Sequence, residues 1–232
     1  MVKEVERYSK ATRYLHWTHA VSFVLLSLTG LILFVPGLGF LAEDGWTRLI
    51  HRIAAVMFVL APMIYVPLNR KKLKYGIKEA FKWGKDDIKW LTAAPRYYFQ
   101  CEEDAMPPQG HMNTGQKLWW LIVLVFGLVF IVTGGIMWFA KSSAPPGLLQ
   151  WAVISHDMAF IVTILMFFVH IYMSVVHPLT RPLKSGSWAS MTKGKISVDF
   201  AKSHYGKWYE ETLKPLIFKL VLFHIVAIHL PL

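Results

Sequence analysis

The chain has 232 residues, of which 55% are apolar and 17% charged, and its formal net charge is +11. So apolar a composition argues against an ordinary soluble domain and indicates a bilayer as the solvent for much of the chain. The excess of Lys and Arg lies between long apolar runs and not on one amphipathic face, so it indicates membrane orientation and not nucleic-acid binding. The single cysteine, Cys101, excludes a disulfide framework, a four-thiolate iron–sulfur site and covalent heme attachment.

Four apolar runs are long enough to cross a hydrocarbon core of about 30 Å at about 1.5 Å of helix rise per residue. We predict spanning helices over residues 17–34, 50–68, 118–139 and 151–176. The first run is too long for a signal peptide and no small-residue cleavage site follows it, so we expect an uncleaved first helix. The expected fold is all-α, an integral membrane four-helix bundle.

Two tight Pro/Gly-containing hairpins, at residues 36–39 and 141–147, join the spans in pairs and hold almost no Lys or Arg. The basic residues gather in the segment 69–117 and after the fourth span. Because short loops rich in Lys and Arg stay in the cytoplasm, we expect both termini and the central loop inside and both hairpins outside. The expected location is the cell inner membrane.

The C-terminal stretch 216–230 is apolar but interrupted by Lys219, His224 and His229. It is short for a span, so we predict a helix in the membrane interface, with a shortened fifth span as the alternative. The expected domains are therefore a four-helix domain at 1–210 and an apolar segment at 211–232.

Four histidines belong to the spans or lie at their ends: His16, His51, His156 and His170. An ionisable side chain inside a membrane is costly and needs a partner. Neutral imidazole suits heme iron, and a porphyrin can fill a slot between the helices of a bundle that has few cysteines. We therefore predict axial heme ligands. For each histidine alone, a snorkelling or hydrogen-bonded side chain at a helix end is an equal alternative.

Depth along the helices pairs these four histidines. His51 and His156 each begin a helix at the outer face, whereas His16 begins the first helix at the inner face. His170 follows His156 by fourteen residues, about 21 Å of rise and within about 40° of the same direction, so it approaches the inner face. We expect two hemes, one between His51 and His156 and the other between His16 and His170.

Other polar residues near the span ends leave alternatives open. His19 is a possible inner ligand, although it points in a different direction from the histidine one turn before it. His177 is expected to be solvated, and no iron is assigned to the remaining histidines. Arg52 and Asp157 either orient imidazoles, contact heme propionates, pair with each other or form interfacial ion pairs without a cofactor role.

Several strings of residues carry a resemblance to a known family: 14–17, 48–51, 113–117, 153–156, 170–173 and the stretch 188–209. At these spacings they resemble the gamma subunit, a cytochrome b, of membrane-bound respiratory formate dehydrogenases, over about residues 13–210. The resemblance implies that His16, His51, His156 and His170 bind two b hemes in the pairing that depth gives.

The resemblance also implies that Asn113, Gly115 and Gln116, with the inner heme ligand, form a menaquinone pocket near the cytoplasmic face. The side chains of Asn113 and Gln116 can donate to and accept from a quinone carbonyl. The alternative for Asn113 is to cap the helix that follows, and both roles can coexist. This sequence departs from the family pattern at His111 and Met112, in its extra His19 and in its apolar C-terminal segment.

By the same resemblance we expect an electron-transfer subunit that performs no chemistry on formate itself. It would take electrons from a periplasmic iron–sulfur subunit, itself joined to a catalytic oxidoreductase subunit, and pass them to menaquinone. Quinone and membrane lipid complete the expected partners, and nucleic acid is not among them. The alternatives are the cytochrome b of a nickel–iron hydrogenase or other periplasmic oxidoreductase, and a heme-free anchor or small transporter whose histidines relay protons.

Overall fold

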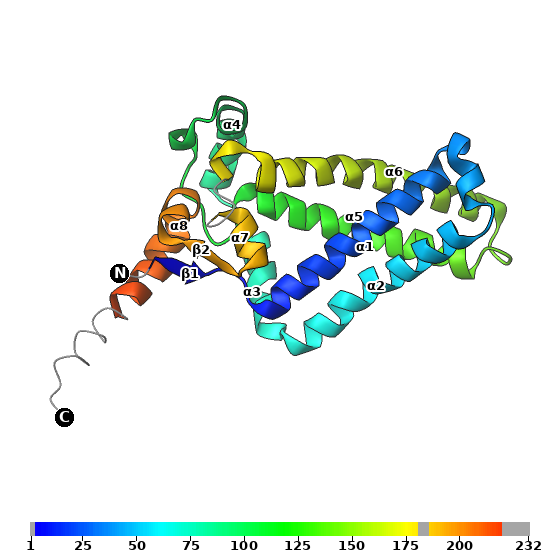
Figure 1. Ribbon diagram of the computed structural model, residues 1–232, viewed down its shortest axis with the longest axis horizontal. Coiled ribbons are helices and arrows are strands. Elements are labelled where there is room, and N and C mark those ends of the chain that lie inside the picture. Colours follow the sequence, from blue (N-terminus) through cyan, green and yellow to red (C-terminus); the bar gives the residue numbers. More distant parts are fainter. Residues whose placement is uncertain (1–2, 181–185, 220–232) are drawn as a thin grey trace. The chain divides into compact units, whose positions relative to one another are not determined.

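The computed structural model describes residues 3–180 and 186–219 (Figure 1). Four of its helices are long and apolar enough to cross a membrane: α1 (Lys10–Phe34), α2 (Trp46–Leu68), α5 (Thr114–Phe139) and α6 (Pro146–Ile171), which a π-helical turn at Tyr172–Val176 continues. The predicted all-α membrane fold with four spans is confirmed. Most of the predicted interfacial helix at 216–230 lies outside the described residues.

Each long helix begins four to seven residues before the predicted apolar run. The backbone hydrogen bonds of a helix continue through polar residues that lie outside the hydrocarbon core. Hydropathy alone does not detect these helical residues, so the predicted starts were too late. The first helical residue of α6 is Pro146, a position where the missing N–H has no intrahelical partner to lose.

The chain divides into two compact units. The span unit comprises Ala11–Tyr75 and Trp119–His170, and the loop unit comprises Met1–Lys10, Gly76–Leu118 and Ile171–Leu232. The boundary predicted at residue 210 falls inside the loop unit and stays a prediction.

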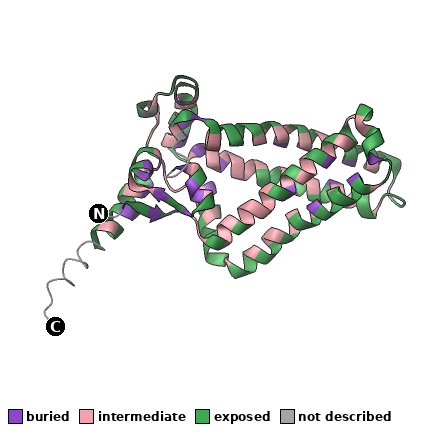
Figure 2. Ribbon diagram, viewed as in Figure 1, coloured by how far each residue is buried: buried purple, intermediate pink, exposed green. Residues whose placement is uncertain are grey.

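The buried positions of the span unit hold small side chains, whereas many of its large apolar side chains are exposed (Figure 2). The buried residues include Ser22, Ala54, Ala152 and Ala159. Small residues let helix backbones approach closely, and exposed apolar side chains are what lipid solvates. The unit therefore has the surface of a membrane domain.

Hydrogen bonds join α1 to α2 at three levels. The contacts are Thr12 Oγ1 to Tyr65 Oη at 3.1 Å, His19 Nε2 to the Phe58 carbonyl at 3.0 Å, and Thr29 Oγ1 to His51 Nδ1 at 2.8 Å. A 3₁₀ turn at Pro36–Ala42 connects the two helices. The α1–α2 hairpin is thus fixed in register along its length.

Outside the long helices, the segment predicted only as a basic loop contains α3 (Arg70–Ala80) and α4 (Lys85–Gln100). The C-terminal part holds α7 (Ser187–Thr192), α8 (Val198–His204), α9 (Gly206–Trp208) and a π-helical turn at Tyr209–Leu213. Short 3₁₀ turns lie at Glu103–Ala105 and Pro178–Thr180.

A short antiparallel sheet, not predicted from the sequence, pairs β1 (Glu4–Glu6) with β2 (Lys195–Ser197) in the loop unit. Side chains from β1, β2, α8 and α9 form a core that includes Val5, Ile196, Phe200 and Trp208. The N-terminal strand is thereby held by the segment that follows the fourth span.

Candidate functional site

The four predicted heme ligands lie in the span unit as two pairs. The ring centres of His51 on α2 and His156 on α6 are 6.4 Å apart. Those of His16 on α1 and His170 on α6 are 6.5 Å apart. The structure therefore brings together the same pairs that helix depth predicted.

Both spacings fit a single iron ion between two axial imidazoles. Because a metal–imidazole bond is about 2 Å long and the ring centre lies about 1 Å behind the bonding nitrogen, two opposed ligands place their ring centres roughly 6 Å apart. Neutral imidazole suits heme iron. Among the described residues, no group of three or more His, Cys, Asp or Glu side chains offers a metal site of another kind.

Each imidazole of the His51–His156 pair is hydrogen-bonded through Nδ1. Thr29 Oγ1 lies 2.8 Å from His51 Nδ1, and Thr133 Oγ1 lies 2.8 Å from His156 Nδ1. Both hydroxyls also donate, at 2.6 Å, to the carbonyl four residues earlier in their own helix. Since a hydroxyl has one proton to give, its oxygen accepts from the imidazole Nδ1–H. The opposite nitrogen, Nε2, then keeps its lone pair for iron.

The two threonines were not predicted from the sequence, although a repeated signal marks them. Each precedes a glycine, Gly30 or Gly134, and stands 22 or 23 residues before its histidine. A Cβ added at Gly30 would lie 3.6 Å from His51 Cε1, and one at Gly134 would lie 3.7 Å from the matching atom of His156. The same Thr-Gly step thus faces an imidazole in both halves of the span unit.

The His16–His170 pair has different surroundings. His16 Nδ1 is buried without a hydrogen-bond partner, as are the hydroxyls of Ser22 and Ser27 on the same helix. The ring of His170 stacks on Trp119, with ring centres 4.8 Å apart and planes inclined by 6°. Buried polar atoms without partners are rare in folded proteins and indicate a place where a further group is bound.

His19, the alternative inner ligand, contacts the backbone of α2 in the structure. Its Nε2–H donates to the Phe58 carbonyl at 3.0 Å. That carbonyl lacks its usual intrahelical donor because the residue four positions later is Pro62, which has no N–H. Within a membrane such a carbonyl needs a partner, and the imidazole supplies one.

We expect His19→Phe to lower the free energy of unfolding by about 1 kcal/mol, the usual net value of one hydrogen bond. Pro62→Ala restores an N–H to α2, so the same change should cost less in a Pro62→Ala background. A double-mutant cycle of unfolding in detergent micelles measures this coupling. Strictly additive effects would contradict the pairing, and heme content should stay unchanged in all three variants.

The expectation that His177 is solvated was wrong. This histidine is fully buried in the loop unit. Its Nε2 lies 3.2 Å from the Tyr98 carbonyl, and its ring stacks on Tyr97 at 5.3 Å. The chain after the fourth span packs against α4, a tertiary contact that a neighbouring proline does not reveal.

Arg52 and Asp157, which follow two of the candidate ligands, do not form the ion pair that was one of their expected roles. The Arg52 guanidinium lies over the Trp138 ring, 5.3 Å from its centre. In the part of the chain that the structure describes, no ion pair joins Arg52 to Asp157. A contact of either residue with a heme propionate stays a prediction.

Asn113 and Gln116 form a capping box at the start of α5. Asn113 Oδ1 accepts from the Gln116 N–H at 2.8 Å, and Gln116 Oε1 accepts from the Asn113 N–H at 3.1 Å. Gln116 Nε2 donates to the Tyr205 hydroxyl at 3.2 Å. The alternative role of Asn113 as a helix cap is therefore present, and within residues 3–180 and 186–219 its Nδ2 donates no hydrogen bond.

The remaining residues of this motif fix the start of α5 against α4. A Cβ at Gly115 would lie 3.0 Å from the Trp90 ring, so any larger residue would require the ring to shift by a few tenths of an ångström. Lys117 Nζ lies 2.7 Å from Asp87 Oδ1, and Thr114 donates to the same oxygen at 2.8 Å. Burial alone raises the pKa of Asp87, but hydrogen bonds from Lys117, Thr114 and a backbone N–H outweigh it and hold the pKa below its ordinary value.

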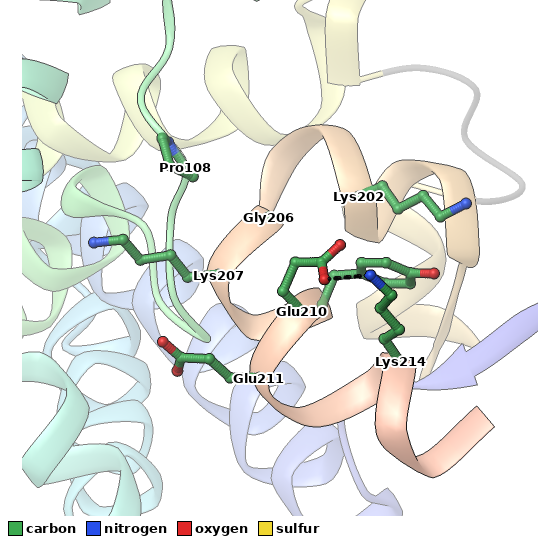
Figure 3. A pocket seen from close by; sticks show the side chains of 8 residues that line it. Pro108, Lys202, Gly206, Lys207, Glu210, Glu211 and Lys214 are labelled. Carbon is green, nitrogen blue, oxygen red and sulfur yellow. Dashed lines mark hydrogen bonds and ion pairs between the residues drawn. The ribbon is translucent and has the colours of Figure 1, made fainter. Parts of the chain in front are cut away.

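The loop unit also contains an open pocket of about 620 Å³ with a charged rim (Figure 3). Lys214 pairs with Glu210 at 2.8 Å across this rim, and Lys202 lies over the Tyr209 ring. A third lysine, Lys207, pairs with Asp86. None of the residues lining this pocket was predicted as a site residue, and its paired charges favour no particular ligand.

A family comparison connects this geometry to known proteins. The family model for prokaryotic cytochrome b561 matches residues 7–194, most of the chain. The chain belongs to the prokaryotic cytochrome b561 family. For a cytochrome b561, heme b is the implied cofactor, and the two histidine pairs fit such a group.

Curated relatives agree with this family. The cytochrome b556(Fdn) subunit of nitrate-inducible formate dehydrogenase from Escherichia coli is 28% identical over 217 residues, covering 91% of this chain and 93% of the relative. The formate dehydrogenase cytochrome b556 subunit of Haemophilus influenzae is 28% identical over 88% of this chain and 82% of its own length. The Escherichia coli formate dehydrogenase cytochrome b556(fdo) subunit is 25% identical over 90% and 94%. The predicted resemblance to formate dehydrogenase cytochrome b subunits is confirmed.

Proposed function

We propose that this cytochrome b561 is the di-heme membrane subunit of a formate dehydrogenase-like complex, carrying electrons from a periplasmic iron–sulfur subunit to menaquinone on the cytoplasmic side. The observation that carries this proposal is the pair of opposed histidine couples, with ring centres 6.4 and 6.5 Å apart. The names of the three relatives support the choice of partner enzyme.

The two couples lie at different levels of the spans. His156 and His170 are fourteen residues apart on α6, which corresponds to about 21 Å of helix rise. Heme, when bound, supplies a one-electron redox centre. His16, His51, His156 and His170 would hold this group, on helices that are long and apolar enough to cross a membrane. Two such positions separated in depth support electron movement across a bilayer.

We further propose that the chain lies in the inner membrane with both termini and the segment 69–117 in the cytoplasm. The Lys and Arg residues of that segment and of the C-terminal part support this orientation. The hairpins after α1 and α5 would then face the periplasm, where an iron–sulfur subunit docks.

The single cysteine tests this orientation without any substitution. Cys101 is exposed and follows α4 in the left-handed conformation, with φ of 59°. We expect a membrane-impermeant maleimide to label it in inside-out vesicles but not in sealed right-side-out vesicles. Labelling of right-side-out vesicles alone would reverse the proposed topology, and detergent-solubilised protein gives the full-labelling reference.

Menaquinone, we propose, contacts the motif that contains Asn113, Gly115 and Gln116. The support is chemical: Asn113 is half-buried and its Nδ2 donates no bond elsewhere in the described chain, so it can donate to a quinone carbonyl. Gly115 adds no side chain of its own next to Asn113, at a place where a Cβ would meet the Trp90 ring, and Gln116 holds the Asn113 backbone in position. The capping role and the quinone role use different atoms of Asn113.

Substitutions that keep the capping box separate the two roles. Asn113→Asp retains a good N-cap but replaces the amide donor with a carboxylate, so we expect quinone-linked turnover to fall at least tenfold while stability and heme content persist. Asn113→Ser also keeps a capping side chain but lacks the amide, so its quinone-linked turnover should fall by a similar factor. The measurement is turnover with a soluble menaquinone analogue. Reduction of an artificial dye by the same variants is the control. Unaltered turnover in both variants would show that the quinone does not bind at Asn113.

A reduced-minus-oxidised spectrum of the purified chain tests the proposal as a whole. A b-type band with two heme equivalents per chain is expected, and the absence of any such band would favour the heme-free anchor or transporter. Purification of the intact complex from membranes then identifies the partner. Co-purification of an iron–sulfur subunit with formate-dependent reduction of the b band is the expected result.

A further inference from the structure

Two threonines hold the imidazoles of one of the two candidate heme positions through hydrogen bonds. We propose that Thr29 and Thr133 are positioning residues that lock His51 and His156 in the Nδ1–H tautomer and lower the reduction potential of the heme between them. This inference rests on the proposed function, because it assumes heme at that couple. It assigns a role to residues that bind neither iron nor quinone.

The tautomer follows from the hydrogen-bond geometry. Each threonine hydroxyl lies 2.6 Å from a helix carbonyl and 2.8 Å from an imidazole Nδ1. If the hydroxyl proton were on the imidazole side, two oxygens 2.6 Å apart would face each other without a proton between them. The hydroxyl therefore donates to the carbonyl, and the imidazole donates to the hydroxyl.

A hydrogen bond from Nδ1–H increases electron donation by the opposite nitrogen. A ligand that donates more strongly stabilises ferric over ferrous iron, so the potential of that heme falls. Both imidazoles of the His51–His156 couple have this bond. In the other couple, Nδ1 of His16 has no hydrogen-bond partner. We therefore assign the potential-lowering effect to the heme position between His51 and His156.

The chain offers a matched control for removal of either hydroxyl. Thr29, Thr133 and Thr163 are 7%, 7% and 6% exposed, and all three donate to the carbonyl four residues earlier. Thr163 has no histidine partner among its hydrogen bonds. Valine at any of the three keeps the shape and loses the hydroxyl, whereas serine keeps the hydroxyl.

Equilibrium redox titration of the b band in membranes containing the full chain provides the readout. The titration should resolve two hemes. Thr29→Val and Thr133→Val should each raise the reduction potential of the same heme, whereas Thr29→Ser and Thr163→Val should leave both potentials unchanged. A tenfold change in the ferric-to-ferrous preference corresponds to about 59 mV in a one-electron couple, and we expect a shift of this order. Titration in a His16→Ala background, where one component remains, identifies the heme that moves.

The outcomes separate this inference from the proposed function. Absence of heme from the unsubstituted chain would overturn the proposed function itself. Two hemes whose potentials are unmoved by Thr29→Val and Thr133→Val would overturn the inference alone. Loss of heme in Thr29→Val with retention in Thr29→Ser and Thr163→Val would support it, whereas equal loss in the valine and serine variants would overturn it because serine keeps the hydroxyl.

Discussion

Replacing His51 with alanine should remove about half of the heme from the chain and leave the remaining half spectroscopically intact. Among the described residues, the ring of His51 is opposed at the required spacing by that of His156, so the loss of one imidazole would leave an iron with a single protein ligand at that position. The second couple, His16 and His170, shares no ligand with the first. Heme extraction per mole of chain measures the stoichiometry.

The corresponding change in the other couple is His170→Ala, which should remove the other half. His19→Ala is the control, because this imidazole donates to the Phe58 carbonyl and opposes no other histidine at heme spacing in the structure. Full heme content in both His51→Ala and His170→Ala would contradict the ligand assignment. Loss of heme in His19→Ala with unchanged folding would instead support His19 as a heme ligand.

Breaking the buried ion pair at the start of α5 should be the most destabilising single change in the loop unit. Lys117→Met leaves the Asp87 carboxylate buried without its cation, and the side chains of both residues are only 9% exposed. Removal of one partner of such a pair typically costs about 3–5 kcal/mol. We expect a loss of this order in the free energy of unfolding, measured by graded denaturation in mixed micelles. The double variant Asp87→Leu, Lys117→Met should recover part of it.

An exposed pair in the same unit supplies the control. Lys214 and Glu210 are bonded at 2.8 Å with side chains 61% and 59% exposed, so Lys214→Met should leave the free energy of unfolding nearly unchanged. If Lys117→Met and Lys214→Met lowered the free energy of unfolding equally, burial would not explain the strength of the Asp87–Lys117 pair.

The buried pair also has a pH signature. Because the pKa of Asp87 in the folded chain lies below its ordinary value of about 4, its stabilising effect is complete above that value. The effect is lost as the pH falls through the lowered pKa. The stability gap between the unsubstituted chain and Lys117→Met should therefore narrow under acid conditions.

The spans and the histidine pairs could be predicted from the sequence because each rests on a simple periodicity. Apolar length marks a helix that crosses hydrocarbon, and helix rise converts the fourteen residues between His156 and His170 into depth. Helix starts were placed too late because the ladder of α5 continues through Thr114 to Lys117, where the sequence is polar. Hydropathy indicates which residues lie in the hydrocarbon core, but it does not show where the helical backbone begins.

What could not be predicted depends on contacts between distant segments. The β1–β2 sheet joins residues 4–6 to 195–197, and strands of three residues carry too little pattern to detect. The burial of His177 depends on tyrosines of α4. The hydroxyl partners of His51 and His156 come from a neighbouring helix, so only the repeated Thr-Gly step hinted at them. The capping role of Asn113 could be predicted because capping is a local effect.

The three hydrogen bonds between α1 and α2 have a consequence for biogenesis. They connect Thr12 to Tyr65, His19 to Phe58 and Thr29 to His51 without any contribution from a cofactor. This hairpin can therefore leave the translocon with its register set and the His51 imidazole already oriented.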